Sequence, residues 1–203
     1  MMVLPTRRPI WLASRSPRRF RMLAEAGVAV RVCPADIDDG CLAPGRVRPE
    51  QWAMSLAYLK ARCVAELLRG REEGTVLAAD TICLYRGRIL GQPADEHAAR
   101  VMLLSMRNKS HNTITGVCVL PVVGGERWLF ADGAVVRYGH VSDEEVDQYI
   151  ASGKWRGKAG AYNLEERMEA GWPVECEGDP GTVMGLPMRR LAPWLAKLRS
   201  AAE

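Results

Sequence analysis

Short apolar runs alternate with longer amphipathic stretches along this chain. Residues 10–14 form an apolar run that ends in a turn. Residues 17–26 follow, with Ser16 as an N-cap residue and Pro17 at the first helical position, which are two helix-start signals. The pattern predicts a strand, a turn and a helix in that order, and residues 28–33 are predicted to form the next strand.

The longest helical stripe begins at Pro49, has apolar or small residues three or four positions apart, and ends at Gly70. Residues 75–84 are rich in apolar and β-branched side chains and predict a strand. Arg86-Gly87 predicts a hairpin turn that leads into residues 89–93. A long helix is therefore expected to precede a β-hairpin in this part of the chain.

Predicted helices and strands also alternate in the second half of the chain. Asp95 and the capping-box pattern of Ser142–Glu145 each predict the start of a helix. Residues 111–120 and 128–138 alternate in polarity and predict a long antiparallel pair. The last predicted elements are a strand over residues 172–176 and a helix from Pro187 to about Leu198. Because helices and strands alternate without a repeat or a low-complexity linker, the sequence predicts an α/β or α+β fold in one compact unit.

The composition agrees with one soluble domain. The chain has 203 residues, of which 48% are hydrophobic and 26% charged. Its net charge of +4 is too small for a protein that coats nucleic acid through phosphate contacts. The six cysteines include no Cys-x-x-Cys pair, and no apolar run is long enough for a membrane span or a secretory signal. We expect a cytoplasmic protein with free thiols that binds neither nucleic acid nor membrane.

The turn between the first predicted strand and helix combines hydroxyl and guanidinium groups. Ser14, Ser16, Arg18 and Arg19 lie where a helix begins, and the free N–H groups and positive end of a helix favour phosphate binding. The turn therefore predicts a site for a polyphosphate. An ordinary Ser-Pro helix cap with solvated arginines would give the same pattern.

Asp80 lies in the middle of the apolar strand predicted over residues 75–84. A carboxylate in such a run needs a metal ion or a cationic partner unless the strand ends there. The acidic turn at Asp36, Asp38 and Asp39 offers further oxygen ligands for Mg²⁺ or Mn²⁺ if it lies close to Asp80. A turn aspartate between two strands, and a solvated acidic loop, are the structural alternatives.

The segment from Gly157 to Glu166 is a second candidate for ligand binding. Its glycines allow the backbone to approach a ligand closely, and Lys158 offers a phosphate contact. The polar residues after Tyr162 could hydrogen-bond a nucleotide base. The end of a helix and the start of a strand would explain the glycines equally well.

Seven co-linear motifs resemble those of the Maf family, over about residues 10 to 198. They are Ser14-Arg15-Ser16-Pro17-Arg18-Arg19, Leu56-Ala57-Tyr58-Leu59-Lys60-Ala61, Ala79-Asp80-Thr81, Gly91-Gln92-Pro93, Thr115-Gly116-Val117, Lys158-Ala159-Gly160-Ala161-Tyr162, and the segment from Gly178 to Pro187. The resemblance implies a nucleoside triphosphate pyrophosphatase linked to septum formation or to the removal of non-standard nucleotides. It also implies an α/β fold, Maf/inosine triphosphatase-like, whose mixed, curved central sheet is flanked by helices. Two lobes would surround a nucleotide cleft in one domain spanning residues 1–203, with residues 1–9 as a flexible N-terminus.

The resemblance also implies roles for individual residues. Asp80 matches the proton acceptor of the family, and Lys60 matches a lysine that contacts phosphate. The substrate-binding residues would be Ser14, Ser16, Arg18, Arg19, Thr81, Gln92, Lys158 and Glu165. A divalent cation, Mg²⁺ or Mn²⁺, would be held by Asp80 and Asp39. The substrate would be a nucleoside triphosphate, and the family commonly forms homodimers.

Three departures from the family pattern bear on activity and specificity. Gln92 replaces the usual lysine of a Gly-Lys-Pro motif, which removes one positive charge, and Asp39 replaces a usual glutamate. Glu165 replaces the glutamine of the pyrimidine-selective branch and resembles the branch that acts on 7-methyl-GTP, because a carboxylate accepts hydrogen bonds from the guanine N–H groups. Arg18 and Thr81 instead resemble the dTTP/UTP branch. The base preference is therefore left unassigned.

Two other functions compete with the enzymatic interpretation. A catalytically impaired nucleotide-binding protein with a role in cell division would explain Gln92 and Asp39, although Asp80 and Lys60 are retained. A nucleic-acid binder is disfavoured, because the net charge is modest and basic residues are not interleaved with aromatic ones.

Overall fold

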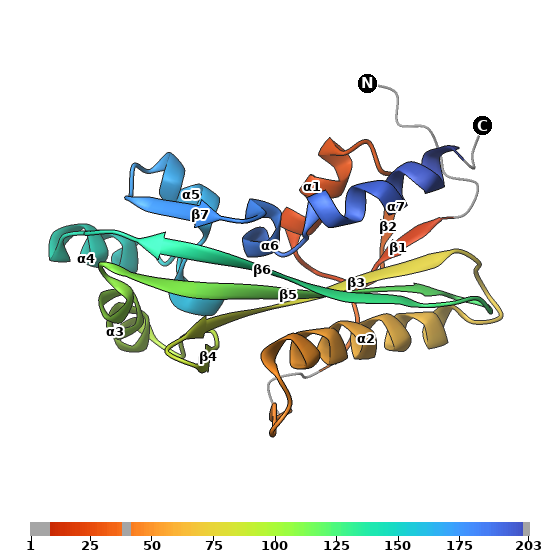
Figure 1. Cartoon of the computed structure of the whole chain (residues 1–203), viewed down its shortest axis with the longest axis horizontal. Helices are drawn as coiled ribbons and strands as arrows, with labels where there is room; N and C mark the ends of the chain where they lie inside the picture. The colour runs from red at the N-terminus through yellow and green to blue at the C-terminus, as the bar shows by residue number, and fades with distance from the viewer. Residues whose placement is uncertain (1–8, 38–41, 201–203) are drawn as a thin grey trace. The chain divides into compact units, whose positions relative to one another are not determined.

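The computed structural model describes residues 9–37 and 42–200, with the side chains of residues 198–200 left out. Of the predicted features, Asp38, Asp39 and nearly all of the N-terminal segment 1–9 lie outside the described residues. The order of elements alternates helices and strands, which confirms the α/β prediction (Figure 1). No helix among the described residues has the length and hydropathy needed to cross a membrane.

Seven strands form one mixed sheet with the order β2-β1-β3-β5-β6-β7, and β4 pairs with β3. The strands are β1 Ile10–Leu12, β2 Val30–Val32, β3 Thr75–Tyr85, β4 Arg88–Leu90, β5 Lys109–Pro121, β6 Trp128–Tyr138 and β7 Val174–Glu177. β1 runs parallel to β2 and β3, whereas β4 and β7 are antiparallel to their partners. β5 and β6 are neighbours joined by six residues, so they run antiparallel, because a parallel pair needs a longer crossover. The mixed sheet is as expected.

The chain divides into two compact units. Among the described residues, the first unit extends to Asp80 and includes Thr115–Asp132 and the segment from Gly185 onward; the second comprises Thr81–Ile114 and Gly133–Met184. β3, β5 and β6 contribute residues to both units. The extent of the domain and the nucleotide cleft implied by the family resemblance stay predictions.

Small side chains let helix α2 (Pro49–Leu68) pack closely on the sheet of the first unit. Ala57, Ala61 and Val64 are completely buried in one cluster with residues of β1, β3 and β5. Gly116 of β5 lies so close to α2 that an added Cβ would be 2.2 Å from the carbonyl carbon of Ala53. Figure 1 shows α2 on one side of this part of the sheet and helices α1 (Pro17–Glu25) and α7 (Met188–Ser200) on the other.

The core of the second unit is built from aromatic residues. Tyr138, Tyr149, Trp155, Tyr162 and Trp172 are buried together with aliphatic side chains of helices α3 (Glu96–Met106) and α4 (Asp143–Ala151). Tyr138 and Tyr149 each meet the ring of Trp172 edge-on, with ring centroids 5.9 and 5.2 Å apart. Trp155 and Trp172 are therefore core residues of the second unit.

The boundaries of several elements agree with the sequence patterns. Ser16 caps α1, Asp95 caps α3 and Ser142 forms a capping box with Glu145 at α4. Arg86 and Gly87 both have positive φ, as a tight hairpin turn requires. The patterns gave no sign of the short helices α5 (Leu164–Glu169) and α6 (Pro180–Met184), and the strand expected at 172–176 is β7 at Val174–Glu177.

Candidate active site

A buried ion pair joins α2 to the middle of β3 in the first unit. The Nζ atom of Lys60 donates a hydrogen bond of 2.6 Å to Oδ1 of Asp80. The two side chains are only 19% and 11% exposed. The sequence predicted a metal ion or a cationic side chain beside Asp80. In this structure that side chain is Lys60. Because both charges are largely shielded from water, the pair is stronger than a surface salt bridge.

The Ser14–Arg19 turn is held together by hydrogen bonds to two hydroxyl groups. Ser16 Oγ accepts from the backbone N–H of Arg19 at 3.4 Å, which caps α1. Ser14 Oγ, which is buried, accepts from the N–H of Ser16 at 3.1 Å and from Nη1 of Arg19 at 3.2 Å. Nε of Arg19 donates to the carbonyl oxygen of Gly185 at 2.9 Å. The turn therefore presents a fixed arginine at the start of a helix.

Arg19 and Asp80 interact electrostatically, so the turn and the ion pair belong to one site. Desolvation lowers the pKa of Arg19, and the neighbouring charge of Arg18 lowers it further, while the Asp80 carboxylate raises it. The Nε atom of Arg18 is buried and has no hydrogen-bond partner among the described residues. A buried N–H group of this kind is satisfied when an anion binds.

Only part of the predicted metal site lies in the described residues. Asp39 lies outside them, so its distance from Asp80 stays untested. Asp36 is fully exposed and its carboxylate lies 3.7 Å from Arg15. Across the described residues, no three His, Cys, Asp or Glu side chains are arranged to hold a metal ion. Asp80 is the carboxylate that the contacts with Lys60 and Arg19 place in the described site.

The remaining predicted substrate residues lie in the second unit. Lys158 Nζ forms an ion pair of 2.5 Å with Oε2 of Glu166, and its side chain is 14% exposed. The carbonyl oxygen of Gly91 accepts from the N–H of Gly160 at 3.2 Å, so the loop that carries Gln92 contacts the glycine-rich segment. Gln92 is exposed, and Thr81 is half-buried at the start of the unit.

Helix α5 changes the interpretation of the residues after Tyr162. The side chain of Asn163 accepts a hydrogen bond of 3.0 Å from the N–H of Glu166 and caps the helix. Glu165 is the half-buried second residue of α5. The helix thus fixes Glu165 and Glu166 beside the loop of Lys158.

Two contributors to the site had no assigned role in the sequence. Gly185 holds Arg19 through its carbonyl oxygen, from 166 positions away in the chain. Its φ is +106°, and an added Cβ would lie 2.9 Å from Nε of Arg19. Glu166 was included only among the polar residues after Tyr162. In the sequence, Gly185 was marked only by its place in the motif from Gly178 to Pro187. The motif did not show that Gly185 contacts Arg19.

The fold and the site define an α/β protein with a lysine–aspartate pair beside a serine–arginine turn. The family model described as Maf-like protein matches residues 9–198 of the chain. The chain therefore belongs to the Maf family, as the motifs indicated.

Curated relatives of the chain are named dTTP/UTP pyrophosphatase. The relative from Pelotomaculum thermopropionicum is 36% identical over 188 residues, which cover 93% of this chain and 95% of the relative. The relative from Halalkalibacterium halodurans is 37% identical and covers 90% of this chain and 92% of its own length. The relative from Salinibacter ruber is 38% identical, with 90% and 87% covered. The similarity extends over nearly the full length of each protein.

Proposed function

We propose that this protein is a nucleoside triphosphate pyrophosphatase that releases a nucleoside monophosphate and pyrophosphate. The observation that carries the proposal is the Lys60–Asp80 ion pair beside the arginine-bearing turn of α1. The names of the relatives support the same reaction. The substrate phosphates would bind at the helix N-terminus, where N–H groups and guanidinium groups attract anions.

Hydrolysis at the α-phosphorus requires a general base and positively charged groups that bind the phosphate oxygens. A water oxygen would attack the α-phosphorus, the bond to the bridging oxygen would break, and the pyrophosphate would leave with that oxygen. Asp80 would accept the proton of the water, while the hydrogen bond from Lys60 orients its carboxylate. Arg19, fixed by Ser14 and Gly185, and Arg18, with its unpaired Nε, would bind phosphate oxygens.

A divalent cation fits this site when it arrives with the substrate. Mg²⁺ is commonly bound through one or two carboxylates plus substrate phosphates, and Asp80 is the described carboxylate. Because Lys60 and Arg19 carry positive charge beside Asp80, the negative triphosphate is needed to offset their repulsion of a cation. When bound, Mg²⁺ or Mn²⁺ would neutralise charge on the phosphate oxygens. Asp39 is the second proposed ligand.

The residues of the second unit would determine which base is accepted. Lys158, Gln92, Thr81 and Glu165 are the proposed contacts, and Glu166 neutralises much of the charge that Lys158 brings. The relatives named for dTTP and UTP favour pyrimidine nucleotides, as do Arg18 and Thr81. The carboxylate of Glu165 favours guanine N–H donors instead. We propose dTTP, UTP and 7-methyl-GTP as the first substrates to compare.

The test is pyrophosphate release from a panel of nucleoside triphosphates in the presence of Mg²⁺ or Mn²⁺. We expect release from at least one of them, and a loss of at least 100-fold in kcat for Asp80→Asn, because the base is removed. Asp147→Asn is the control, since Asp147 is an exposed surface residue paired with Arg100. Circular dichroism would show that both variants remain folded.

Two results would contradict the proposal. Equal activity of the Asp80→Asn variant and the native protein would remove Asp80 from the reaction. If no nucleotide of the panel is hydrolysed while nucleotides raise Tm, the protein is the nucleotide-binding protein that Gln92 and Asp39 suggest, and it is not an enzyme for these substrates.

A further inference from the structure

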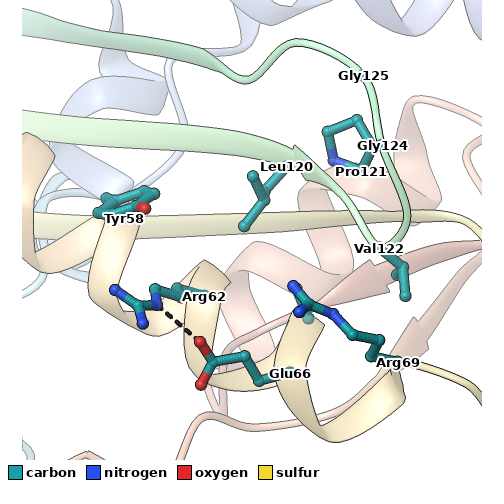
Figure 2. Close-up of a pocket in the computed structure, with 10 residues that line it drawn as sticks. Tyr58, Arg62, Glu66, Arg69, Leu120, Pro121, Val122, Gly124 and Gly125 are labelled. Carbon is teal, nitrogen blue, oxygen red and sulfur yellow. Dashed lines mark hydrogen bonds and ion pairs between the residues drawn. The ribbon is translucent and has the colours of Figure 1, made fainter.

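A pocket of about 380 Å³ lies within the first unit, along the C-terminal half of α2 (Figure 2). One wall is the helix and the other is the end of β5 with the turn that follows it. The lining residues are Tyr58, Arg62, Ala65, Glu66, Arg69, Leu120, Pro121, Val122, Gly124 and Gly125. The volume is in the range of sites that bind small molecules.

This pocket is separate from the Lys60–Asp80 pair, although Lys60 lies between two of its residues in the sequence. Tyr58 and Arg62 are each two positions from Lys60 on the same helix. Two positions correspond to about 200° around a helix, so Lys60 is on the opposite face. The pocket therefore lies outside the site that we propose for the reaction.

The pocket has an excess of positive charge. Arg62 donates through Nε to Glu66 at 2.7 Å, and this bond holds the pKa of Glu66 below its usual value. Arg69, one helical turn from Glu66, has no carboxylate within ion-pair distance among the described residues. Figure 2 shows the guanidinium groups of Arg62 and Arg69 on either side of the Glu66 carboxylate.

A third guanidinium group lies beside the pocket, next to the lining residue Tyr58. Arg127 stacks on the ring of Tyr58, with its central carbon 5.0 Å from the ring centroid, and forms no ion pair within the described part of the chain. Two guanidinium groups of the lining thus face one carboxylate, and Arg127 brings the local excess to two positive charges. The turn that closes the pocket contains Gly124, where an added Cβ would meet nothing within 4 Å, so space is left next to the backbone.

We propose that this pocket binds a small anion with a phosphoryl group. A phosphate ester carries nearly two negative charges at neutral pH and three acceptor oxygens, which matches the excess charge of the pocket. A carboxylate carries one charge and would leave one guanidinium group without a partner. Arginine forks bind phosphate oxygens with two parallel hydrogen bonds, and the ligand would use Arg69 in this way, while the charge of Arg127 near Tyr58 adds to the attraction.

The test uses inorganic phosphate as the probe and the amide signals of Gly124 and Gly125 in ¹⁵N–¹H NMR spectra as the readout. Phosphate is titrated at pH 7.5 and constant ionic strength, so that general screening does not change. We expect saturable shifts of both signals. Arg69→Gln should weaken the apparent affinity at this pocket about tenfold, because it removes a charge-assisted contact, and Arg127→Gln should weaken it by a smaller factor, because it removes a charge beside the pocket. Arg46→Gln, which removes the same charge from an exposed loop, should leave it unchanged.

Several results would overturn this proposal. Phosphate could leave the two glycine signals in place, or it could shift them equally in the arginine variants and in the native protein. Acetate could shift them with the same affinity as phosphate, which would remove the preference for a dianion. Shifts confined to Ser14–Arg19 would report only the proposed active site. None of these results would affect the proposed hydrolysis, which is measured by pyrophosphate release.

Discussion

Single residues determine how much of the candidate site the sequence could predict. Asp80 was identifiable because a carboxylate in an apolar strand must have a partner, and Ser16 because N-caps follow local rules. The partner of Asp80 depends on how α2 packs on β3, which no local pattern encodes. The contact between Arg19 and Gly185 spans 166 positions and was equally inaccessible. Local chemistry was therefore predictable, and the pairing of distant residues required the fold.

His111 gives a prediction on the pH dependence of stability. Burial lowers its pKa from 6.5 to about 4, and its Nε2 atom lies 2.9 Å from the hydroxyl oxygen of Tyr162. As the pH falls from 6.5 towards 4, the unfolded chain takes up a proton that the folded chain does not. We expect His111 to contribute fully to stability above pH 6.5 and to lose on the order of 3 kcal/mol by pH 4.

Urea unfolding of the native protein and of a His111→Gln variant between pH 7 and pH 4 would measure this contribution. Glutamine can still hydrogen-bond Tyr162 but does not titrate. The free energy of unfolding of the native protein minus that of the variant should fall by about 3 kcal/mol between pH 7 and pH 4. A difference that stays constant over this range would show that His111 titrates alike in the folded and unfolded chains.

Elements were predictable where their periodic pattern was long. α2 has 20 residues and β5 has 13, and both were expected from the sequence. α5 has six residues and α6 has five, too few for a helical stripe to be recognised beside glycines and prolines. Their caps, Asn163 and Asp179, are residues that also favour turns. Short elements therefore depend on tertiary packing, which the sequence pattern does not show.

The packing of α2 on β5 gives a prediction at this scale. Gly116→Ala would place a methyl group within 2.2 Å of the Ala53 backbone, so the helix must move away from the strand. We expect a loss of about 3 kcal/mol in the free energy of unfolding. Gly133→Ala in β6 is the matched control, because its added Cβ meets nothing within 4 Å and alanine is a better strand residue than glycine.

Chemical denaturation followed by circular dichroism would compare these two variants. The Gly133→Ala variant should be as stable as the native protein, within about 0.5 kcal/mol, or slightly more stable. Equal stability of the Gly116→Ala variant would show that α2 does not lie against β5 at Ala53.

At the scale of the whole molecule, the two units have cores of different composition. The first is packed with alanine and valine under α2, and the second with tyrosine and tryptophan. The sequence predicted the fold class, because both cores follow from the alternation of helices and strands. The pattern of apolar and polar residues did not reveal the division into two units, since β3, β5 and β6 are continuous across the boundary; only the family resemblance implied two lobes.

The reactivity of the cysteines can be used to measure burial in both units. Burial raises the pKa of Cys83 to about 12 and that of Cys118 to about 11, so neither thiol is ionised at pH 8. Cys33, Cys63 and Cys176 are partly exposed and form no disulfide within the described part of the chain. We expect iodoacetamide at pH 8 to modify these three well before Cys83 and Cys118.

Peptide mass spectrometry after timed labelling would measure the order of reaction. In denaturant, all five thiols should react at similar rates, which is the control for reagent access. Fast labelling of Cys118 in the native protein would mean that the contact between α2 and the sheet opens readily. Cys41 lies outside the described residues and is not part of this prediction.

The strands at the margins of the sheet limit how copies of this chain can associate. β2 and β4 have three residues each and β7 has four, while β3, β5 and β6 inside the sheet have 11 or 13. β7 also carries two exposed carboxylates, those of Glu175 and Glu177, and Glu177 is paired with Arg137 of β6. A neighbouring molecule could add only a few backbone hydrogen bonds at these margins. A second copy that associates with this chain would therefore depend on side-chain contacts more than on continuation of the sheet.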